Sequence, residues 1–600
     1  MRWNNCGWGQ RLSIALAGFL VIAVPAWGQD AAAPAAGETT PDAPVKATKA
    51  RFEVTIPTIA AVGSSIDEAT LRAIFSGDFV GHAEELATLS ATSISIPELR
   101  ITFDIPEKGA DAVSGEVVLR DIAINSVTNG IAQEVSVGSS ETATKDGGAV
   151  KFGKLSADSF DIGGLLGFYG LVESNSATEP KVIYKNLAVE GGTMTTPDAI
   201  CNIRGATVAS FKARPLKVSF TDFIAIAQKM EVEDEKPSPE TIAQFVTFYV
   251  DLIDAVEVSP VKFAGFDCAG TTNEGKPLTV NVGPVTVGAF AHGRYPDVTV
   301  TDVKITAAGD GTMSLGEFQM KGFDVAKPLA ALKNAGTTLD DTWFETHYRE
   351  LIPAFEGFAF SSVNIDVLDD EHPGERIKAA VENFDLTLKD YINGIPTDIS
   401  TLASHIVVAL PETSEDETIL RLKALGIKNI DVGYDVAIKW EKPASEIRVN
   451  RFSITGVDMG SIAVASVIGQ ASEALFSADT TEALMASLSL TLKKVNIDIN
   501  DSGLADLLLQ AAATDSGKDV AEFRRSISGL TQGTLLMFLG GAANATDIVA
   551  AVGEFLNGKK SLSVTVTSKD PSGVTFDELN ALKEDPTGLT EKVDIEATAR

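Results

Sequence analysis

The chain has 600 residues, of which 44% are hydrophobic and 22% charged, with a mean hydropathy of +0.12. This composition is typical of a folded chain of about two to five domains and excludes a mainly disordered protein. Because 82 acidic residues face 49 lysines and arginines, the net charge of −33 argues against nucleic-acid binding. No apolar run in the body is long enough for a polytopic membrane protein.

The N-terminus is typical of a secretory signal peptide, predicted over residues 1–28. Arg2 and Arg11 flank a short polar region, and Leu12–Val24 forms an apolar core that is too short to span a bilayer. The alternative is a retained N-terminal anchor, which would need about 20 apolar residues. Cys6 precedes the apolar core and is therefore not the lipid-bearing cysteine of a lipoprotein. We expect cleavage after Gly28 and export of the mature chain.

Residues 29–50 are rich in Ala, Pro and Thr, which predicts a flexible linker. The body of the chain then holds two cysteines, Cys201 and Cys268, each within a strand-like segment. In an oxidising compartment two cysteines allow a single pairing, so we expect a disulfide between them. Two separately buried thiols are the alternative.

An octapeptide of the form apolar-x-apolar-polar-polar-apolar-x-apolar recurs along the body. It occurs as Ile94-Ser-Ile96-Pro-Glu-Leu99-Arg-Ile101 and as Val117-Val-Leu119-Arg-Asp-Ile122-Ala-Ile124. Further copies begin at Val150, Val182, Val256, Val280, Val298, Phe358, Ala379, Leu425, Ile447 and Leu490. Their spacing has no fixed period, which argues against a regular solenoid or propeller and favours hairpins and meanders.

The octapeptide breaks the alternation of a strand. Side chains alternate between faces, so an unbroken strand would place its first two apolar positions on one face and its last two on the other. A bulge at positions 4 and 5 would restore a common apolar face and increase the twist; a strand that crosses between two layers is the alternative. We therefore predict a β-rich α+β fold with large, curved, mainly antiparallel sheets built from bulged strands, with inserted helices.

The predicted helices define the domain organisation. The first two are expected over Thr221–Met230 and Pro239–Asp254, where Ser238 supplies an N-cap, and a third over Glu415–Ala424. Others are expected over Leu504–Ala513, Lys518–Ile527 and Asp547–Leu556, with a strand at Ser561–Thr567. The expected order is a β-rich region (51–220), a helical insertion (221–255), a second β-rich region with short helices (256–502) and a mainly helical C-terminal subdomain (503–600).

Three segments resemble chemical motifs without completing them. Gly553–Lys560 resembles a phosphate-binding loop but ends in Lys560 instead of Ser or Thr, which favours a helix C-cap turn. Asp498–Gly503 resembles half of a calcium loop, although Leu509 stands where a bidentate Glu is needed, which favours a strand followed by a capped helix. Asp369–His372 is interpreted as an acidic surface turn. The five histidines form no metal motif. We predict no enzymatic activity, no catalytic residues, no cofactor and no metal.

The octapeptide, with a polar or Asn/Asp residue at its bend, is similar to strands that recur through AsmA-like and YdgA-like envelope proteins of Gram-negative bacteria. The residues at that place here are Asp121, Asn186, Asp302, Asn383 and Asn429. The C-terminal region resembles exported alphaproteobacterial proteins of unassigned function through residues 503–508 and 555–562. The resemblance implies a long curved sheet whose apolar concave face handles lipid. Those families keep an N-terminal membrane helix, which this chain is expected to lose by cleavage.

Two functions of different classes follow. The first is a periplasmic, non-enzymatic protein that binds or transfers lipid or another apolar ligand along a curved β-sheet groove. The second is a structural or interaction protein of the cell envelope, with envelope proteins as its partners and the outer surface of the cell as its alternative location. Only 7 tyrosines and 5 tryptophans are present, which argues against an adhesive aromatic surface. Neither function involves nucleic acid or a transmembrane helix in the mature chain.

Overall fold

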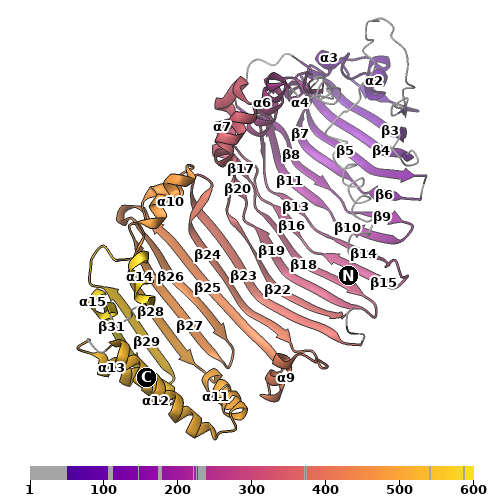
Figure 1. The fold of residues 1–600 in the computed structure, drawn as a ribbon. Coiled ribbons are helices and arrows are strands. Elements are labelled where there is room, and N and C mark those ends of the chain that lie inside the picture. Colours follow the sequence, from indigo (N-terminus) through magenta and orange to yellow (C-terminus); the bar gives the residue numbers. More distant parts are fainter. Residues whose placement is uncertain are drawn as a thin grey trace, which may run out of the picture. The chain divides into compact units, whose positions relative to one another are not determined.

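The computed structural model describes residues 51–600 apart from 106–112, 146, 173–178, 221, 225, 227–237, 370–371, 373, 540–541 and 585–587. The predicted signal peptide and linker therefore lie outside the described residues. Contacts divide the chain into an N-terminal unit (residues 1–292 and 336–338) and a C-terminal unit (residues 293–335 and 339–600). Each unit is built on antiparallel β-sheet, as the sequence predicted, with helices at the ends of the strands (Figure 1).

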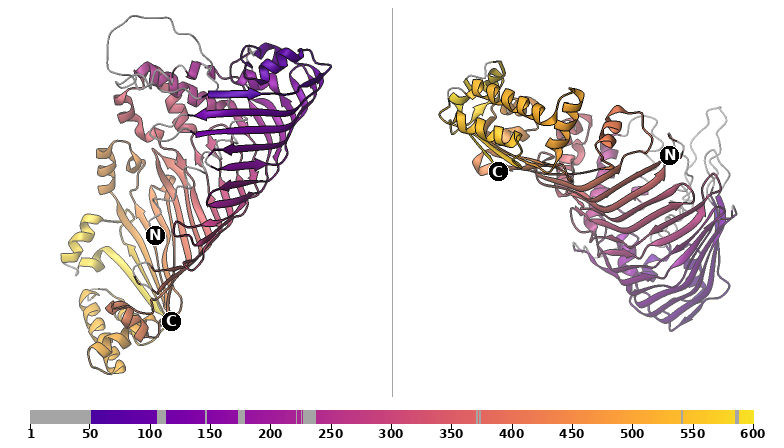
Figure 2. Two further views of the ribbon diagram at one scale, coloured as in Figure 1. Left: turned by 90° about the vertical axis from the view of Figure 1, so that its right-hand side faces the viewer. Right: turned by 90° about the horizontal axis from the view of Figure 1, so that it is seen from below.

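In the N-terminal unit long strands are followed by shorter ones. Its longest strands, β3, β4 and β5, pair in chain order, and the later strands extend the sheet side by side (Figure 2). The strands are β1 (Arg51–Thr55), β2 (Ala60–Val62), β3 (Ala91–Ile105), β4 (Val113–Thr128), β5 (Ile131–Thr144), β6 (Ala149–Phe152), β7 (Leu155–Asp161), β8 (Lys181–Val189), β9 (Gly192–Thr196), β10 (Ala199–Ile203), β11 (Ala206–Ala213), β12 (Val256–Val258), β13 (Val261–Phe263), β14 (Phe266–Thr271), β15 (Pro277–Val282) and β16 (Val285–Val287).

Two hydrophobic clusters stabilise the N-terminal unit. Helix α2 (Glu68–Phe75) packs Leu71 and Ile74 against β3 and β4. Helices α4 (Ile162–Phe168) and α6 (Pro239–Ala255) pack Phe168 and Phe248 against β8 and β11. Helix α6 begins as predicted, since the Ser238 side chain accepts a hydrogen bond from the Thr241 backbone N–H. The short helix α3 (Ala83–Ala87) belongs to the same unit.

The C-terminal unit is a meander in which most strands pair with the next one along the chain. The strands of its large sheet are β18 (Val298–Ala307), β19 (Gly311–Met320), β22 (Gly357–Leu368), β23 (Arg376–Ile392), β24 (Ile395–Ala409), β25 (Asn429–Glu441), β26 (Glu446–Gly456), β27 (Gly460–Gly469), β28 (Thr491–Asp501), β29 (Ser561–Ser568), β30 (Val574–Thr575) and β31 (Val593–Ala599). Strands β17 (Arg294–Tyr295), β20 (Phe323–Asp324) and β21 (Ala354–Phe355) form a small separate sheet.

Helices of the C-terminal unit lie in the connections between strands. They are α7 (Ala326–Ala335), α8 (Asp341–His347), α9 (Glu417–Ala424), α10 (Thr480–Leu488), α11 (Leu504–Asp515), α12 (Val520–Leu539), α13 (Ala545–Leu556), α14 (Phe576–Glu584) and α15 (Leu589–Lys592). The 3-10 helices are η3 (Tyr348–Leu351), η4 (Lys442–Ala444) and η5 (Glu473–Phe476), while η2 (Gly336–Thr338) belongs to the N-terminal unit. Among the described residues no helix is long and apolar enough to cross a membrane.

The octapeptides coincide with breaks in the strands. At position 5 of four copies the backbone is left-handed, with φ of 55° at Asp121, 50° at Asn186, 53° at Asp302 and 55° at Ser362. Asn and Asp tolerate this conformation because their short side chains bond to the local backbone. Cluster packing confirms the common face for β4, since Leu119, Ile122 and Ile124 on both sides of the break contact one core.

The remaining copies break in other ways. Gly153-Lys154, Ser259-Pro260 and Gly283-Pro284 each separate two strands. In the copies that begin at Ile94 and Ala379, one residue of the motif is left without a partner in the ladder. In the copy at Ile447, Asn450 and Arg451 have no partner in the ladder with β27, and in the copy at Leu490 the ladder skips Lys493. The prediction for the copy at Leu425 is wrong, because Leu425 caps helix α9 and Gly426 (φ 84°) turns the chain into β25. A glycine in that conformation ends a helix, so the alternation there is accidental.

Helix boundaries depart from the prediction in part of the chain. Most of the predicted helix Thr221–Met230 lies outside the described residues, and its described residues, 222–224 and 226, are helical as expected. Helix α12 runs to Leu539, well past the predicted end at Ile527, because its later turns pack on α13. Strand β31 and the short helices α2, α7 and α10 were not predicted. The C-terminal hundred residues are helix-rich, as expected, but β29 and β31 extend the sheet from β28.

Candidate functional site

One face of the large sheet in the C-terminal unit carries apolar side chains in rows that cross the strands. A row is a set of residues that lie directly opposite one another on successive antiparallel strands, and such residues share a face. The first row contains no polar residue other than a tyrosine. It consists of Val300, Phe318, Phe360, Phe384, Ala403, Tyr434, Ile454, Ile462, Ile499, Leu562 and Ala599.

Two further rows run parallel to the first on the same face. On most strands each row lies two residues along the strand from the row before it. The second row is Val298, Met320, Phe358, Leu386, Thr401, Val436, Phe452, Val464, Ile497, Val564 and Ala597. The third row is Leu388, Ile399, Ile438, Val449, Ser466, Val495, Val566 and Ile595. We call the surface formed by the three rows the apolar face. Stacked rings reinforce it, with Phe384 4.8 Å from Phe360 and 5.2 Å from Phe358 between ring centroids.

The opposite face of the same strands is polar. The residues that alternate with the first two rows include Asp385, Leu402, Asp435, Ser453 and Asp498. Arg451 pairs with Asp435 on this face. The sheet therefore separates an uncharged surface from a charged one, which is the usual pattern of an antiparallel sheet with one solvated face.

Bulges keep the apolar side chains on one face where the alternation breaks. Ala403 and Ile406 of β24 lie opposite Tyr434 and Val432 of β25, although the β24 residues are three positions apart in the chain and the β25 residues only two. The extra residue in β24 accompanies His405, whose backbone is left-handed with φ 47°. Its ring Nδ1 lies 3.0 Å from a carboxylate oxygen of Asp431, and this hydrogen bond raises the pKa of His405. The bulge thus places the side chain of His405 on the polar face of the sheet.

A second bulge places a lysine beside a buried carboxylate. Lys493 has no partner in the ladder between β27 and β28, and its Nζ lies 3.1 Å from Oε1 of Glu446. Arg448 contacts the other oxygen of that carboxylate at 2.5 Å. Hydrogen bonding from Lys493 lowers the pKa of Glu446 despite the opposing effect of burial. These charged groups are paired with one another and leave the apolar face uncharged.

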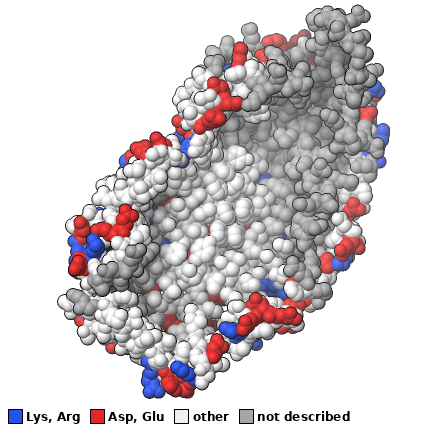
Figure 3. Space-filling model, viewed as in Figure 1, with Lys and Arg blue, Asp and Glu red and all other residues white. Residues whose placement is uncertain are grey.

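Most of the apolar face has no second layer over it among the described residues. On strands β18 to β28, Ala403 is the only residue of the three rows that is fully buried. Phe452, Ile454 and Ile462 are adjacent on β26 and β27 and are 46%, 53% and 50% exposed. Figure 3 shows the face over these strands with hardly any Lys, Arg, Asp or Glu, while charged side chains gather at the strand ends. An ordinary two-layer fold would bury such side chains.

One end of the apolar face is closed by helices. Leu535 and Leu539 of α12 and Ile548 and Val549 of α13 form a cluster with Ile595 and Ala597, which end the third and second rows. The cover extends over β29 and β31 and stops there among the described residues. The apolar face is therefore open along its middle strands and closed at its last strands.

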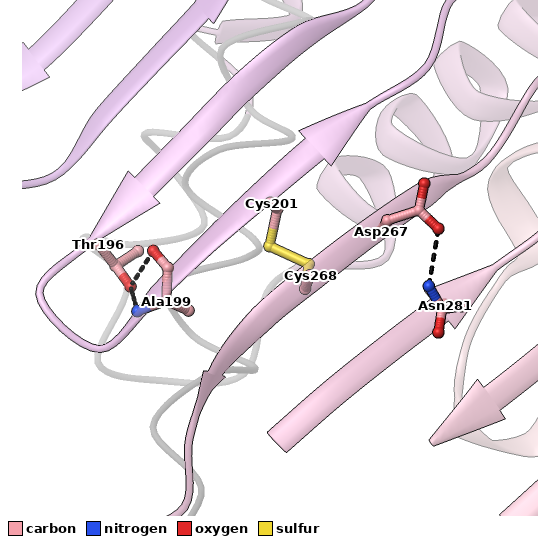
Figure 4. Close-up of a disulfide and its surroundings, with 6 residues drawn as sticks. All are labelled: Thr196, Ala199, Cys201, Asp267, Cys268 and Asn281. Atoms are coloured by element: carbon pink, nitrogen blue, oxygen red, sulfur yellow. Dashed lines mark hydrogen bonds between the residues drawn. A yellow bond between two sulfur atoms is a disulfide. The ribbon is translucent and has the colours of Figure 1, made fainter. Parts of the chain in front are cut away.

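The disulfide lies in a comparable row of the N-terminal unit. Cys201 of β10 and Cys268 of β14 are directly opposite each other, with Cα atoms 3.9 Å apart, and their sulfur atoms are bonded as the sequence predicted (Figure 4). Both cysteines are buried. Beside them, the Asn281 side chain donates a hydrogen bond of 2.8 Å to Asp267, also drawn in Figure 4. The bond joins strands that are 67 residues apart in the chain and agrees with an exported protein.

Two of the three incomplete motifs have the structural roles that the sequence favoured, while residues 370–371 of the predicted acidic turn Asp369–His372 lie outside the described residues. Gly558 (φ 117°) follows the end of α13, so Gly553–Lys560 is a helix C-terminus. Asp501 accepts hydrogen bonds from the backbone N–H groups of Gly503 and Ala505, so the calcium-like segment is a strand followed by a capped helix. Within the described part of the chain, no three or more His, Cys, Asp or Glu side chains are placed to hold a metal ion.

A cavity of about 830 Å³ beside α7 was not expected from the sequence. Its lining includes Lys327, Arg349, Glu350, Lys389 and Asp390. Cations and acids alternate in this lining, so the cavity favours neither sign of charge. The residues Phe452 and Ile454 were within the octapeptide that begins at Ile447, whereas Ile462 was missed; the alternation of residues 460–468 is the signal that could have found it.

Comparisons with known proteins give little direction. A family model described only as an uncharacterised protein matches residues 453–600, which include the last strands of the apolar face and helices α10 to α15. No curated protein and no solved structure matches the chain.

Proposed function

We propose that the chain is an exported, periplasmic protein that binds lipid, or another apolar ligand with long hydrocarbon chains, on the apolar face. The observation that carries the proposal is the set of three adjacent rows whose side chains on the middle strands are only partly buried, with Phe452, Ile454 and Ile462 about half-exposed. Leaving such side chains in water is unfavourable by about 25 cal/mol per Å² of apolar surface, and covering them with a ligand recovers that free energy.

The chemistry of the rows favours hydrocarbon chains over a polypeptide as the occupant. Across β18 to β29 the rows contain only three hydroxyl side chains, those of Thr401, Tyr434 and Ser466, so the face offers few hydrogen-bonding groups. A polypeptide would need partners for its backbone N–H and C=O groups, whereas an acyl chain needs none.

The dimensions agree with this occupant. At about 4.8 Å per strand, the path from β18 to β29 is roughly 40 Å long. One leaflet of a bilayer has a hydrocarbon thickness of about 15 Å, half of the whole core. The path is therefore long enough for more than one acyl chain in succession, which is the requirement for moving a lipid along the sheet.

The periplasmic location and the absence of catalysis belong to the proposal. The predicted signal peptide at residues 1–28 and the disulfide Cys201–Cys268 support export. Binding is favoured over catalysis because the three rows contain no charged side chain, and the charged groups at the two bulges, Glu446 and His405, are paired with neighbouring charges. Cell fractionation tests the location; a pool on the outer surface would instead favour the envelope-interaction function.

Native mass spectrometry of the protein purified from its own periplasm, with lipid extraction of the same sample, tests the proposal directly. A reproducible amphiphile at a ratio near one or above is the expected result. A clean mass without ligand, together with no uptake of phospholipid from added vesicles, would refute lipid binding and leave a structural or interaction role in the envelope.

A further inference from the structure

Helix α12 carries apolar side chains on two opposite faces. The inner face, with Leu535 and Leu539, packs against α13 and β31. On the outer face Leu530 is 71% and Met537 is 74% exposed, and these residues are seven apart, so they project from the same side of the helix. Since the inner face is firmly packed, the outer side chains are held in the solvent by a defined structure.

Neighbouring turns extend this exposed surface. Helix α11 packs beside α12, and Arg524 of α12 pairs with Asp506 of α11. Leu508 of α11 is 60% exposed. We call Leu508, Leu530 and Met537 the outer patch. Figure 1 shows α11 and α12 next to each other at the end of the sheet where β28 and β29 lie.

Charge is absent from the part of the chain that forms most of the outer patch. Residues 526–546 contain no Asp, Glu, Lys or Arg, although 22% of the chain is charged and its net charge is −33. A partner with a charged surface would find no complementary group there. An uncharged apolar surface is complementary to the hydrocarbon region of a bilayer.

The side-chain types also argue against a protein partner. The binding hot spots of protein interfaces are enriched in Tyr, Trp and Arg, and leucine is under-represented among them. The outer patch consists of Leu and Met, whose flexible side chains adapt to a fluid environment. Helix α12 is not apolar enough to cross a membrane, so it would lie in the interface.

We infer that α11 and α12 dock the protein on a lipid bilayer through Leu508, Leu530 and Met537, beside the closed end of the apolar face. This inference rests on the proposed function, because it brings the bilayer next to β28, where the open part of the apolar face meets the helices that cover β29 and β31. The inner face of the same helix covers Ile595 and Ala597, the last residues of two rows. Docking would therefore bring the border between the covered and the open part of the apolar face to the membrane surface.

Flotation of the full-length protein with phosphatidylcholine vesicles tests the inference. The test variant is Leu530→Glu with Met537→Glu, and the matched control is Leu420→Glu with Val457→Glu, at residues that are 49% and 46% exposed elsewhere in the same unit. Burial of one side chain of this size contributes about ten- to a hundredfold to partitioning. We expect at least a ~100-fold loss of vesicle binding for the test variant, little change for the control, and no dependence on salt.

Each other result overturns the inference. Wild-type protein that does not float with vesicles, or a test variant that floats as well as the wild type, would remove the outer patch as a membrane contact. A wild-type dimer that the test variant converts to a monomer in light scattering would make the outer patch an interface between copies. Lipid carried by the purified protein is measured separately, so protein that floats but carries no lipid would refute the proposed function alone.

Discussion

Replacing the three most exposed side chains of the apolar face should abolish lipid binding without unfolding the protein. Phe452, Ile454 and Ile462 are each about half-exposed. Full burial of a side chain of this size contributes about 1.5–3 kcal/mol, so covering the exposed halves of all three contributes about 2–4.5 kcal/mol to ligand binding. The triple serine variant should therefore bind about 40- to 2,000-fold more weakly.

The assay is titration with a fluorescent phospholipid analogue, with unfolding followed by circular dichroism on the same samples. The matched control replaces Leu402, Leu420 and Val457 by serine, since these are similarly exposed (40%, 49% and 46%) and belong to none of the three rows. Both variants lose a similar part of their buried surface and should unfold at similar temperatures. If the control loses as much affinity as the test variant, or a folded test variant binds like the wild type, the apolar face is not the binding surface.

Three further predictions concern stability. Cys268→Ser opens a loop of 67 residues and should destabilise the protein by about 4 kcal/mol in chemical denaturation, while reductant should leave the variant unaffected. Asp251→Ala leaves the buried guanidinium of Arg214 without the carboxylate 2.8 Å away and should cost about 3–5 kcal/mol; a loss below 1 kcal/mol would contradict the role of this ion pair. Hydrogen bonding from Lys592 lowers the pKa of Glu578 from 4.5 to about 2. The stabilisation by this ionised carboxylate is therefore complete above pH 4.5 and is lost as the pH falls to 2. The melting temperatures of the wild type and of Glu578→Gln should differ at pH 7 and converge near pH 2.

The sequence predicted the breaks in the strands because the backbone conformation there depends on local chemistry. Asp121, Asn186 and Asp302 occupy position 5 of their octapeptides and are left-handed, as short polar side chains allow. The copy at Leu425 shows the limit of the pattern, since Gly426 directs the chain into a turn that the apolar alternation cannot reveal. The bulge at His405 lies outside every octapeptide. Its hydrogen-bond partner Asp431 is 26 residues away in the chain, so no local pattern in the sequence indicates this bulge.

Whether the apolar face is covered could not be predicted from the sequence. The same alternation serves a two-layer sandwich and an open sheet, and the difference depends on where distant helices pack. The helices α12 and α13 cover Ile595 and Ala597 but not Ile454, and nothing in the strand sequences distinguishes these residues. The exposed side chains were thus foreseen as apolar positions of strands, while their exposure required the structure.

An open apolar face also requires protection from self-association. Half-exposed Ile and Phe side chains on neighbouring strands would pair with the same face of a second copy if nothing opposed it. The charge of the chain supplies that opposition: its net charge is −33, acids such as Asp435 and Asp498 lie on the opposite face, and charged side chains gather at the strand ends around the apolar face (Figure 3). The last strand, β31, carries the exposed acids Asp594 and Glu596, which discourage pairing with another sheet edge. Electrostatic repulsion of this kind keeps two copies of the protein apart at long range without changing the apolar face itself. The apolar face therefore remains available to a small uncharged ligand, while the sheet of a second acidic copy is excluded.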